Sequence, residues 1–202
     1  DDNIRDFYRL QKNILYRTTS GTTFYACENF VDRYKNVALA GMQYRYFAPI
    51  GSKHPPFVLN TRIYSCILIK NDVPFRWRGK YNEDTDLSLR ALKDGWVTIL
   101  FFAFIANKIS TMTMRGGNTE ELYEGDGRFQ MALSLMNQHP DVVKVVRKWG
   151  RWQHSVDYRS FRGNRLIKKE CISEEDRVNN FGMIFAKTDN NTQSQVKSRL
   201  GF

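Results

Sequence analysis

Three long apolar runs stand out in the pattern of hydrophobic and polar positions, at residues 37–47, 57–69 and 97–105. Each has the length of a β-strand, and the last is so nearly continuous that a strand buried on both faces of a sheet is expected. Between the runs lie segments whose apolar residues follow helical spacing. This alternation predicts an α/β fold in which a mixed sheet is flanked by helices.

Four segments carry the helical spacing. A surface helix is predicted over residues 4–16 from the intervals between Ile4, Phe7, Leu10, Ile14 and Leu15. Residues 28–36 are expected to form a second helix. A third helix is predicted over residues 85–93, where Leu87, Ala91 and Leu92 form an apolar stripe. Gly95, just after this segment, suits the left-handed position that follows the last turn of a helix. A fourth is predicted after Asp126, with an apolar face of Phe129, Leu133 and Met136.

The start of the third predicted helix is the most informative stretch, because three carboxylates stand together there: Glu83, Asp84 and Asp86. Asp84 or Thr85 can cap the first turn, and acids suit the positive end of a helix dipole, so a structural role accounts for one or two of them. Three exceed what capping needs. Upstream, Trp77 offers an apolar plate and Gly79 lets the backbone approach a ligand closely. This arrangement is how an α/β enzyme presents a carboxylate to a sugar.

Longer strings around this stretch carry a family resemblance. They read R-I-Y-S-C-I-L-I-K-N-D-V-P-F-R-W-R-G-K-Y-N-E-D-T-D-L-S-L-R-A-L-K-D-G-W, T-M-T-M-R-G-G-N-T-E-E-L-Y and R-K-W-G-R-W-Q-H-S-V-D-Y-R. The strings resemble the TET-associated glycosyltransferases of bacteriophages. The resemblance covers residues 1–170, which are expected to form one domain, with a partly loose extension over residues 171–202. It implies a GT-A-like sheet that lacks part of the N-terminal nucleotide-binding half.

The resemblance also implies an activity. The expected reaction moves a sugar from a nucleotide-sugar, expected to be a UDP-sugar, to a 5-hydroxymethylated pyrimidine such as 5-hydroxymethylcytosine in phage DNA. The expected place is the cytoplasm of the infected bacterial host. Two other functions stay open: a glycosyltransferase with a protein acceptor, and a DNA-binding module without turnover.

Individual residues take roles from the same resemblance. Asp84 matches the closing aspartate of the family's Glu-Asp motif and is expected to be the general base, while Glu83 is expected to bind hydroxyls of the donor sugar. Asp86 is grouped with Trp77 and Gly79 on the donor side, where it orients the loop or caps the helix.

A metal site is implied by the first residues of the chain. Asp1, Asp2 and Asn3 resemble the D-x-D-like element of GT-A enzymes, with Asn in the third position, and His154 resembles by position a histidine that many of these enzymes add to the metal shell. Hard oxygen ligands suit Mn²⁺ or Mg²⁺. From the residues alone, a mobile acidic terminus and a structural histidine are the alternatives.

Residues 111–128 form a long segment rich in glycine, asparagine and acids, which is typical of a lid or binding loop. Its string Arg115, Gly116, Gly117 and Asn118 can cover a diphosphate or a DNA backbone with one charge and close amides. A plain surface connection is the alternative.

The pattern of charged residues is most informative over residues 142–169. The 202 residues carry a formal net charge of +10, which favours a polyanionic partner. Residues 142–169 interleave cations with aromatic rings, a mixture that suits phosphate neutralisation and stacking on an exposed base. A solvated basic face is the alternative. The residues predicted to contact DNA are Lys144, Arg147, Lys148, Arg151, Trp152, Arg159 and Arg162.

Other sequence features narrow the class of protein. Cys27, Cys66 and Cys171 are widely spaced and contain no C-x-x-C pair, so neither a disulfide framework nor a zinc ribbon is indicated. No apolar run is long enough to span a membrane, and no signal peptide is recognised, so no membrane partner is expected.

Overall fold

The computed structural model describes residues 3–48, 50–51, 54–64, 66–109 and 127–171. Within these residues the elements are β1 (Ile4–Gln11), β2 (Ile14–Thr18), α1 (Thr22–Val31), β3 (Val37–Tyr44), η1 (Arg45–Phe47), β4 (Phe57–Leu59), β5 (Ile67–Ile69), α2 (Glu83–Lys93), β6 (Val97–Lys108), α4 (Gly127–Gln138), β7 (Val143–Lys148), β8 (Arg151–Val156) and η2 (Tyr158–Phe161). None of the helices in this part of the chain combines the length and apolar character needed to cross a bilayer.

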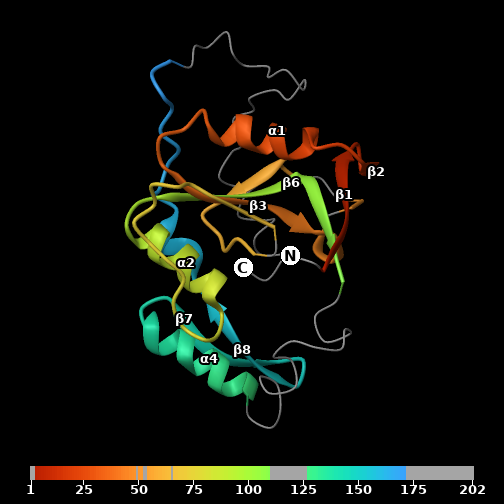
Figure 1. Ribbon diagram of the computed structural model, residues 1–202. Helices are drawn as coiled ribbons and strands as arrows, with labels where there is room; N and C mark the ends of the chain where they lie inside the picture. Colours follow the sequence, from red (N-terminus) through yellow and green to blue (C-terminus); the bar gives the residue numbers. More distant parts are fainter. Residues whose placement is uncertain (1–2, 49, 52–53, 65, 110–126, 172–202) are drawn as a thin grey trace.

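A mixed sheet forms the centre of the molecule (Figure 1). Its strands follow the order β2-β1-β6-β3-β5, and β4 adds to β6. β3 runs parallel to β6, whereas the remaining pairs are antiparallel. The predicted α/β class with a mixed, helix-flanked sheet is therefore confirmed.

The helix expected over residues 4–16 is wrong, because these residues form the β1–β2 hairpin. Lys12 and Asn13 join the strands with φ values of 49° and 64°. Two successive positive φ values define the two-residue turn whose twist matches a hairpin. The apolar intervals that suggested a helix are divided between two strands, and Phe7 packs edge-on against Phe24 of α1 at 4.8 Å between ring centroids.

Two other expected elements have different limits. The helix expected over residues 28–36 is α1, which begins earlier, at Thr22, and ends at Val31. The run at 57–69 is not one strand: β4 and β5 are separated by the segment 60–66, which begins with Asn60 at a φ of 57°. The strand expected at 37–47 is β3, which ends at Tyr44 and is followed by the 3-10 helix η1. The strand expected at 97–105 is β6, which continues to Lys108, and the helix expected at 85–93 is α2.

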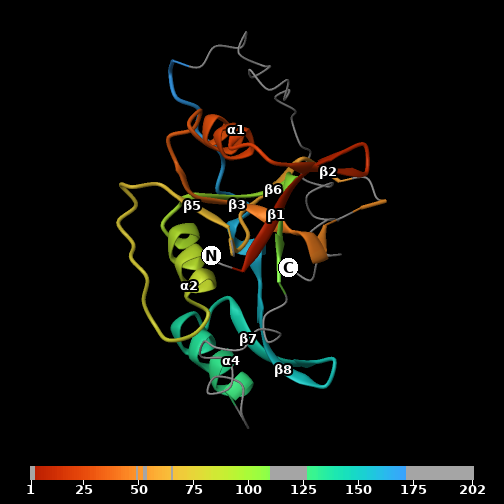
Figure 2. The ribbon, with the colours of Figure 1, turned by 45° about the vertical axis from the view of Figure 1, so that its right-hand side comes forward.

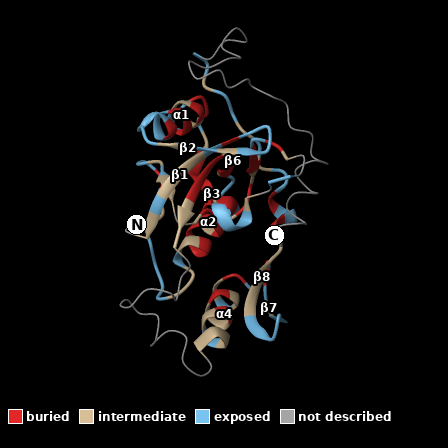
Figure 3. Cartoon of the chain, turned by 90° about the vertical axis from the view of Figure 1, so that its right-hand side faces the viewer, coloured by how far each residue is buried: buried red, intermediate tan, exposed pale blue. Residues whose placement is uncertain are grey.

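Two hydrophobic clusters cover the two faces of the sheet. Cys27 and Phe30 of α1 pack with Phe101 and Phe104 of β6 on one face. Leu87 and Ala91 of α2 pack against other residues of β3 and β6 on the opposite face. Buried residues consequently concentrate in β3, β6 and α2 and on one side of α1 (Figure 3).

A third layer packs below α2 and consists of α4 with the β7–β8 hairpin (Figure 2). Its contact with α2 is a separate apolar cluster of Leu89, Leu92, Leu135, Val142, Val143, Tyr158 and Phe161. The fully buried positions of α4 are Ala132 and Leu135, one step away from the face expected from the sequence. This layer brings residues from the end of the described chain next to the acidic start of α2.

Candidate active site

Asp84 is the second residue of α2, and local geometry holds its carboxylate in place. The helix follows Asn82, whose φ of 54° is left-handed. Asp84 Oδ1 accepts a hydrogen bond from the backbone N–H of Thr85 at 2.6 Å and another from the Thr85 hydroxyl at 3.2 Å. Ser88 Oγ donates to the Asp84 carbonyl at 2.8 Å. The carboxylate is thus anchored through one oxygen on a rigid helix start.

Arg62 and Tyr64, which the sequence analysis did not single out, lie near Asp84. Burial raises the pKa of Asp84 above its usual value, and the positive charge of Arg62 acts in the opposite direction. The Arg62 guanidinium lies over the Tyr64 ring at 5.0 Å from the centroid. Tyr64 donates from its hydroxyl to Oε1 of Gln43 at 3.0 Å, and burial raises its pKa to about 12.

His154 enters the same neighbourhood from β8. Burial lowers the pKa of His154 to about 4, and the charge of Arg62 adds to this effect. The same guanidinium acts electrostatically on Tyr158 of η2. Asp84, Tyr64, His154 and Tyr158, from four parts of the chain, therefore converge on Arg62. A pKa this low keeps the His154 imidazole neutral at pH 7.

Contacts within the core fix the 60–66 segment that carries Arg62 and Tyr64. A Cβ on Gly41 would lie 2.5 Å from Ile63 Cγ2 and 2.6 Å from the Cys66 carbonyl oxygen. Only a glycine at position 41 leaves room for the close approach of this segment. The backbone N–H of Ile63 donates to Ser88 Oγ at 3.1 Å, which ties the segment to α2.

Asp86 has a different environment from Asp84, although it is only two residues further along α2. Its carboxylate is fully buried and accepts hydrogen bonds from Arg78 Nη2 at 2.9 Å and Arg90 Nε at 2.9 Å, and it lies 2.8 Å from His139 Nε2. Burial acts to raise its pKa, yet the hydrogen bonds from His139 and Arg78 hold that pKa well below its usual range. Asp86 was grouped with the sugar-binding residues, but its oxygens are occupied by protein groups. It anchors the loop.

The loop before α2 presents its side chains outward. Trp77 is 49% exposed, and Glu83 is exposed. Gly79 has a φ of 79°, a conformation that side chains with a Cβ rarely adopt. Arg78 and Arg90 hold this loop against the helix, because Arg90 Nη2 also donates to the Arg76 carbonyl at 2.5 Å. The loop with Trp77 and Gly79 is therefore fixed to α2 through Asp86, and Glu83 directly precedes Asp84.

The expected metal ligands are only partly within the described residues. Asp1, Asp2 and the string Arg115, Gly116, Gly117 and Asn118 lie outside them. Asn3 holds the end of β6 through its carbonyl, which accepts from the Ile109 N–H at 2.9 Å. Within the described part of the chain, no group of three His, Cys, Asp or Glu side chains is arranged to hold a metal ion. Carboxylate, amide and neutral imidazole donors together suit Mn²⁺ or Mg²⁺ in their chemistry.

The β7–β8 hairpin divides the predicted DNA-contacting residues between two faces. Arg147 lies 6.0 Å from the ring centroid of Trp152, and that ring packs at 5.2 Å on Phe129 of α4, so this pair is on the α4 side of the hairpin although both side chains are exposed. Lys144, Lys148 and Arg151 share the outer face. There, a hollow of about 590 Å³ is lined by Lys144, Lys148 and Arg159 together with apolar and polar neighbours.

The two arginines beyond the hairpin, Arg159 and Arg162, both act electrostatically on Asp157. Arg159 forms an ion pair with Asp157, with Nη2 and Oδ2 separated by 2.6 Å, and this partner lowers the pKa of Asp157 to about 2. Arg162 is exposed after η2. The charge of Arg159 is therefore partly neutralised within the protein.

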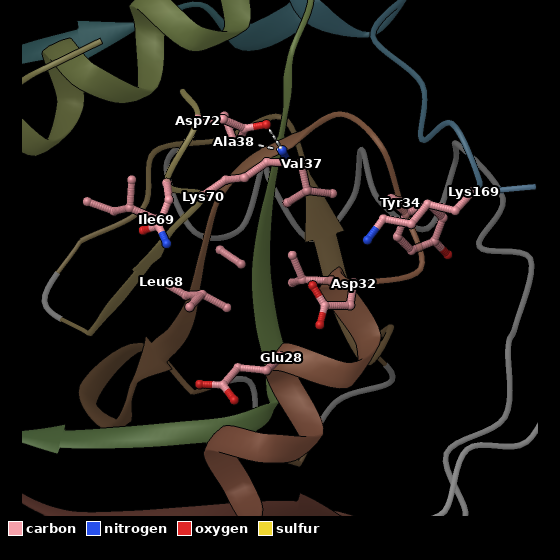
Figure 4. A pocket seen from close by; sticks show the side chains of 13 residues that line it. Glu28, Asp32, Tyr34, Val37, Ala38, Leu68, Ile69, Lys70, Asp72 and Lys169 are labelled. Carbon is pink, nitrogen blue, oxygen red and sulfur yellow. Dashed lines mark hydrogen bonds and ion pairs between the residues drawn. The ribbon is translucent and has the colours of Figure 1, made fainter. Parts of the chain in front are cut away.

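A second hollow, of about 410 Å³, lies between α1 and the edge of the sheet at β5 (Figure 4). Glu28 and Asp32 project from α1 on one side, and Lys70 and Lys169 approach from the others. Lys70 is paired with Asp72. This hollow is on the α1 side of the sheet, whereas Asp84 starts α2 on the other side.

The mixed sheet flanked by helices, with three acids at the start of α2, is consistent with a GT-A-like fold. Residues 1–117 match the model of a family described as TET-Associated Glycosyltransferase, and the chain belongs to this family. Neither a curated protein nor a solved structure matched the chain. The matched residues include Arg62 and Asp84, while His154 and the hairpin follow them.

One signal in the sequence could have located the missed residues. Gln43 interrupts an apolar run and is fully buried, and its amide accepts from the Tyr64 hydroxyl. A buried polar side chain must find a partner, so Gln43 in the run at 37–47 indicates a polar neighbour across the sheet. Which residue supplies that partner depends on the fold, and nothing in the local pattern identifies Tyr64 or Arg62.

Proposed function

We propose that the protein transfers a sugar from a nucleotide-sugar, with a UDP-sugar as the expected donor, to the hydroxymethyl group of 5-hydroxymethylcytosine in phage DNA. The observation that carries this proposal is the anchored carboxylate of Asp84 near Arg62, whose charge also acts on His154, in a chain of the TET-Associated Glycosyltransferase family. The site of action is then the cytoplasm of the infected bacterium.

In the proposed reaction the acceptor hydroxyl attacks the anomeric carbon of the sugar. Its oxygen forms the new glycosidic bond, the bond to the donor phosphate breaks, and the electron pair leaves with the nucleoside diphosphate. Asp84 accepts the hydroxyl proton as the bond forms, which is general base catalysis. Glu83, exposed one residue earlier, is assigned to hydroxyls of the donor sugar, and Trp77 offers the apolar face of a ring.

The charge of the departing diphosphate needs compensation. A Mn²⁺ or Mg²⁺ ion would supply it when bound, and Asp1, Asp2, Asn3 and His154 are the residues assigned to hold it. Arg115, Gly116, Gly117 and Asn118 are assigned to the same diphosphate or to the DNA backbone. Arg62 contributes a fixed positive charge next to Asp84, which favours the ionised form that a base requires.

The proposed acceptor is DNA because the exposed cations gather on the hairpin that also carries His154. Lys144, Lys148 and Arg151 are exposed on one face, and the chain has a net charge of +10. Such a surface neutralises phosphates irrespective of base sequence. Base recognition is then left to the site at Asp84.

The direct test incubates the protein with duplex DNA containing 5-hydroxymethylcytosine, a panel of nucleotide-sugars and Mn²⁺ or Mg²⁺. The DNA is then digested to nucleosides for mass spectrometry. We expect one hexose mass added to hydroxymethylcytosine with one donor, none on DNA containing only cytosine, and a loss of transfer in chelator. Sugar on added protein with none on DNA would favour the protein acceptor, and DNA binding with no transfer would favour the module without turnover.

A further inference from the structure

The tip of the β7–β8 hairpin carries an unusual residue. Trp149 and Gly150 join Lys148 to Arg151 and have φ values of 50° and 72°. Turns with two positive φ values favour Asn or Asp followed by Gly, and a bulky side chain in this region is an outlier. Trp149 is also 85% exposed. A strained backbone thus holds a large aromatic ring in water, a combination typical of residues with a binding role.

The two residues that flank the turn point to the kind of ligand. Lys148 and Arg151 are directly opposite each other in the hairpin register, and both are exposed. Like charges at opposite positions destabilise a strand pair. An anion placed between or beside them removes this repulsion. The tip therefore combines two cations, which suit phosphates, with one exposed ring, which suits the face of a base.

The hairpin is a firm support for this tip and connects it to the site. Arg147 and Trp152 are paired across the strands, and the Trp152 ring packs on Phe129 of α4. Five residues along the same hairpin, His154 shares the neighbourhood of Arg62 and Asp84. At about 3.3 Å per strand residue, Arg151 at the base of the turn is roughly 10 Å from His154. That spacing allows one DNA duplex to reach both.

We propose that Trp149 is a wedge that enters the base stack of duplex DNA beside the target nucleotide, while Lys148 and Arg151 bind the phosphates on either side. The ring fills the space that the hydroxymethylcytosine leaves when it turns out of the helix towards Asp84. Extruding a base breaks its stacking and pairing, and an inserted aromatic ring restores part of the lost stacking. This inference rests on the proposed DNA acceptor.

The test compares Trp149→Ala and Trp149→Phe with the wild type on three DNA substrates. Each contains one hydroxymethylcytosine: a single strand, a matched duplex, and a duplex with an abasic site opposite the target. The matched control is Tyr25→Ala, which removes a 55% exposed ring from α1. We expect Trp149→Ala to lower kcat/KM on the matched duplex by roughly ten- to hundredfold, the range of one aromatic–base stack. Trp149→Phe should retain most of the wild-type kcat/KM, and Tyr25→Ala should show no loss of kcat/KM.

On the single strand the Trp149→Ala variant should remain within about twofold of the wild type, and on the abasic duplex the loss should shrink, because little or no pairing opposes extrusion. An equal loss on all three substrates, or no loss on the matched duplex, would overturn the wedge. If the wild type transfers sugar to none of the three, the DNA acceptor itself is wrong. A 2-aminopurine base next to the target reports unstacking by fluorescence without turnover, and wild type and variant giving the same signal would also reject the wedge.

Discussion

Asp84 and Asp86 are two residues apart in the first turn of α2, yet their surroundings shift their pKa values in opposite directions. Asp84 is half-buried with one guanidinium near it, and burial raises its pKa. Asp86 is fully buried among Arg78, Arg90 and His139, which hold its pKa low. A carboxylate that stays strongly ionised among fixed partners is suited to structure, and one with a raised pKa is suited to exchange a proton.

Asp84→Asn keeps the shape of the side chain and removes the base. We expect kcat to fall by about 10²- to 10⁴-fold with DNA and donor binding nearly unchanged. In the wild type, activity should fall as pH decreases through the raised pKa, so the acid limb lies above that of an ordinary aspartate. Kinetics from pH 4 to 8 measure both effects. The control is Glu83→Gln. If Asp84→Asn turns over normally and Glu83→Gln is inactive, Glu83 is the general base and Asp84 is not.

The same substitution should not lower stability at pH 7. A raised pKa in the folded state means that the ionised carboxylate is disfavoured by folding, and this penalty develops as pH rises from the ordinary pKa of aspartate to the raised one. Asp84→Asn removes the penalty, so its melting temperature should equal or exceed that of the wild type at neutral pH. Differential scanning calorimetry at pH 4 and pH 7 checks this, and a large loss of stability at pH 7 would show that the carboxylate is needed for the fold.

Asp86→Asn should have the opposite signature, because it removes the negative charge and one of the two oxygens that accept hydrogen bonds from Arg78 and Arg90. Breaking a buried ion pair costs about 3–5 kcal/mol, and we expect roughly 2–3 kcal/mol here since Arg78 is half-exposed. The low folded-state pKa gives the wild type stability that is present above the ordinary pKa of about 3.9 and lost as pH falls below it. Urea unfolding at pH 7 and pH 3 should therefore show a smaller difference at pH 3. The exposed Asp94→Asn, at the end of the same helix, should differ little from the wild type at pH 7.

At the scale of elements, local pattern predicts well where several signals agree. In α2 the apolar stripe, the acidic first turn and Gly95, with a φ of 85°, all describe the same helix. In the β1–β2 hairpin the apolar intervals suit a helix, and only the turn at Lys12 and Asn13 contradicts it. A Lys-Asn pair is a weaker turn signal than Asn-Gly, so the spacing of the apolar residues predicts a helix where the chain forms two strands.

The candidate site shows the same limit. The place of Asp84 at an acidic helix start could be predicted, because the residues that define this start are adjacent in the sequence. Arg62 and Tyr64 could not, because their place depends on how closely the segment 60–66 crosses β3 at Gly41. That contact is a property of the packed sheet and has no local spacing to reveal it.

Gly41→Ala tests the dependence of the site on this crossing. The added Cβ would meet the Cys66 carbonyl oxygen at 2.6 Å, and a backbone atom cannot turn away as a side chain can. We expect a loss of about 1–3 kcal/mol in the free energy of unfolding, together with reduced kcat as Arg62 and Tyr64 shift. Chemical denaturation and steady-state kinetics measure the two. Gly21→Ala is the control, because nothing lies within 4 Å of its Cβ position. If the two variants have the same stability and kcat, the contact at Gly41 does not position Arg62 and Tyr64.

At the scale of the whole molecule, the net charge of +10 makes salt dependence the most direct property to measure, and the structure shows which cations should dominate it. Lys148 and Arg151 face outward with like charges opposed, whereas the guanidinium of Arg159 is paired with Asp157. Each phosphate contact that is lost reduces the slope of log K against log salt by about 0.9. The Lys148→Ala, Arg151→Ala double variant should therefore flatten the slope by about 1.8, and Arg159→Ala by clearly less than 0.9. Fluorescence anisotropy with a labelled duplex from 50 to 200 mM salt gives these slopes. A wild type whose affinity does not change with salt would mean that the basic surface does not hold DNA.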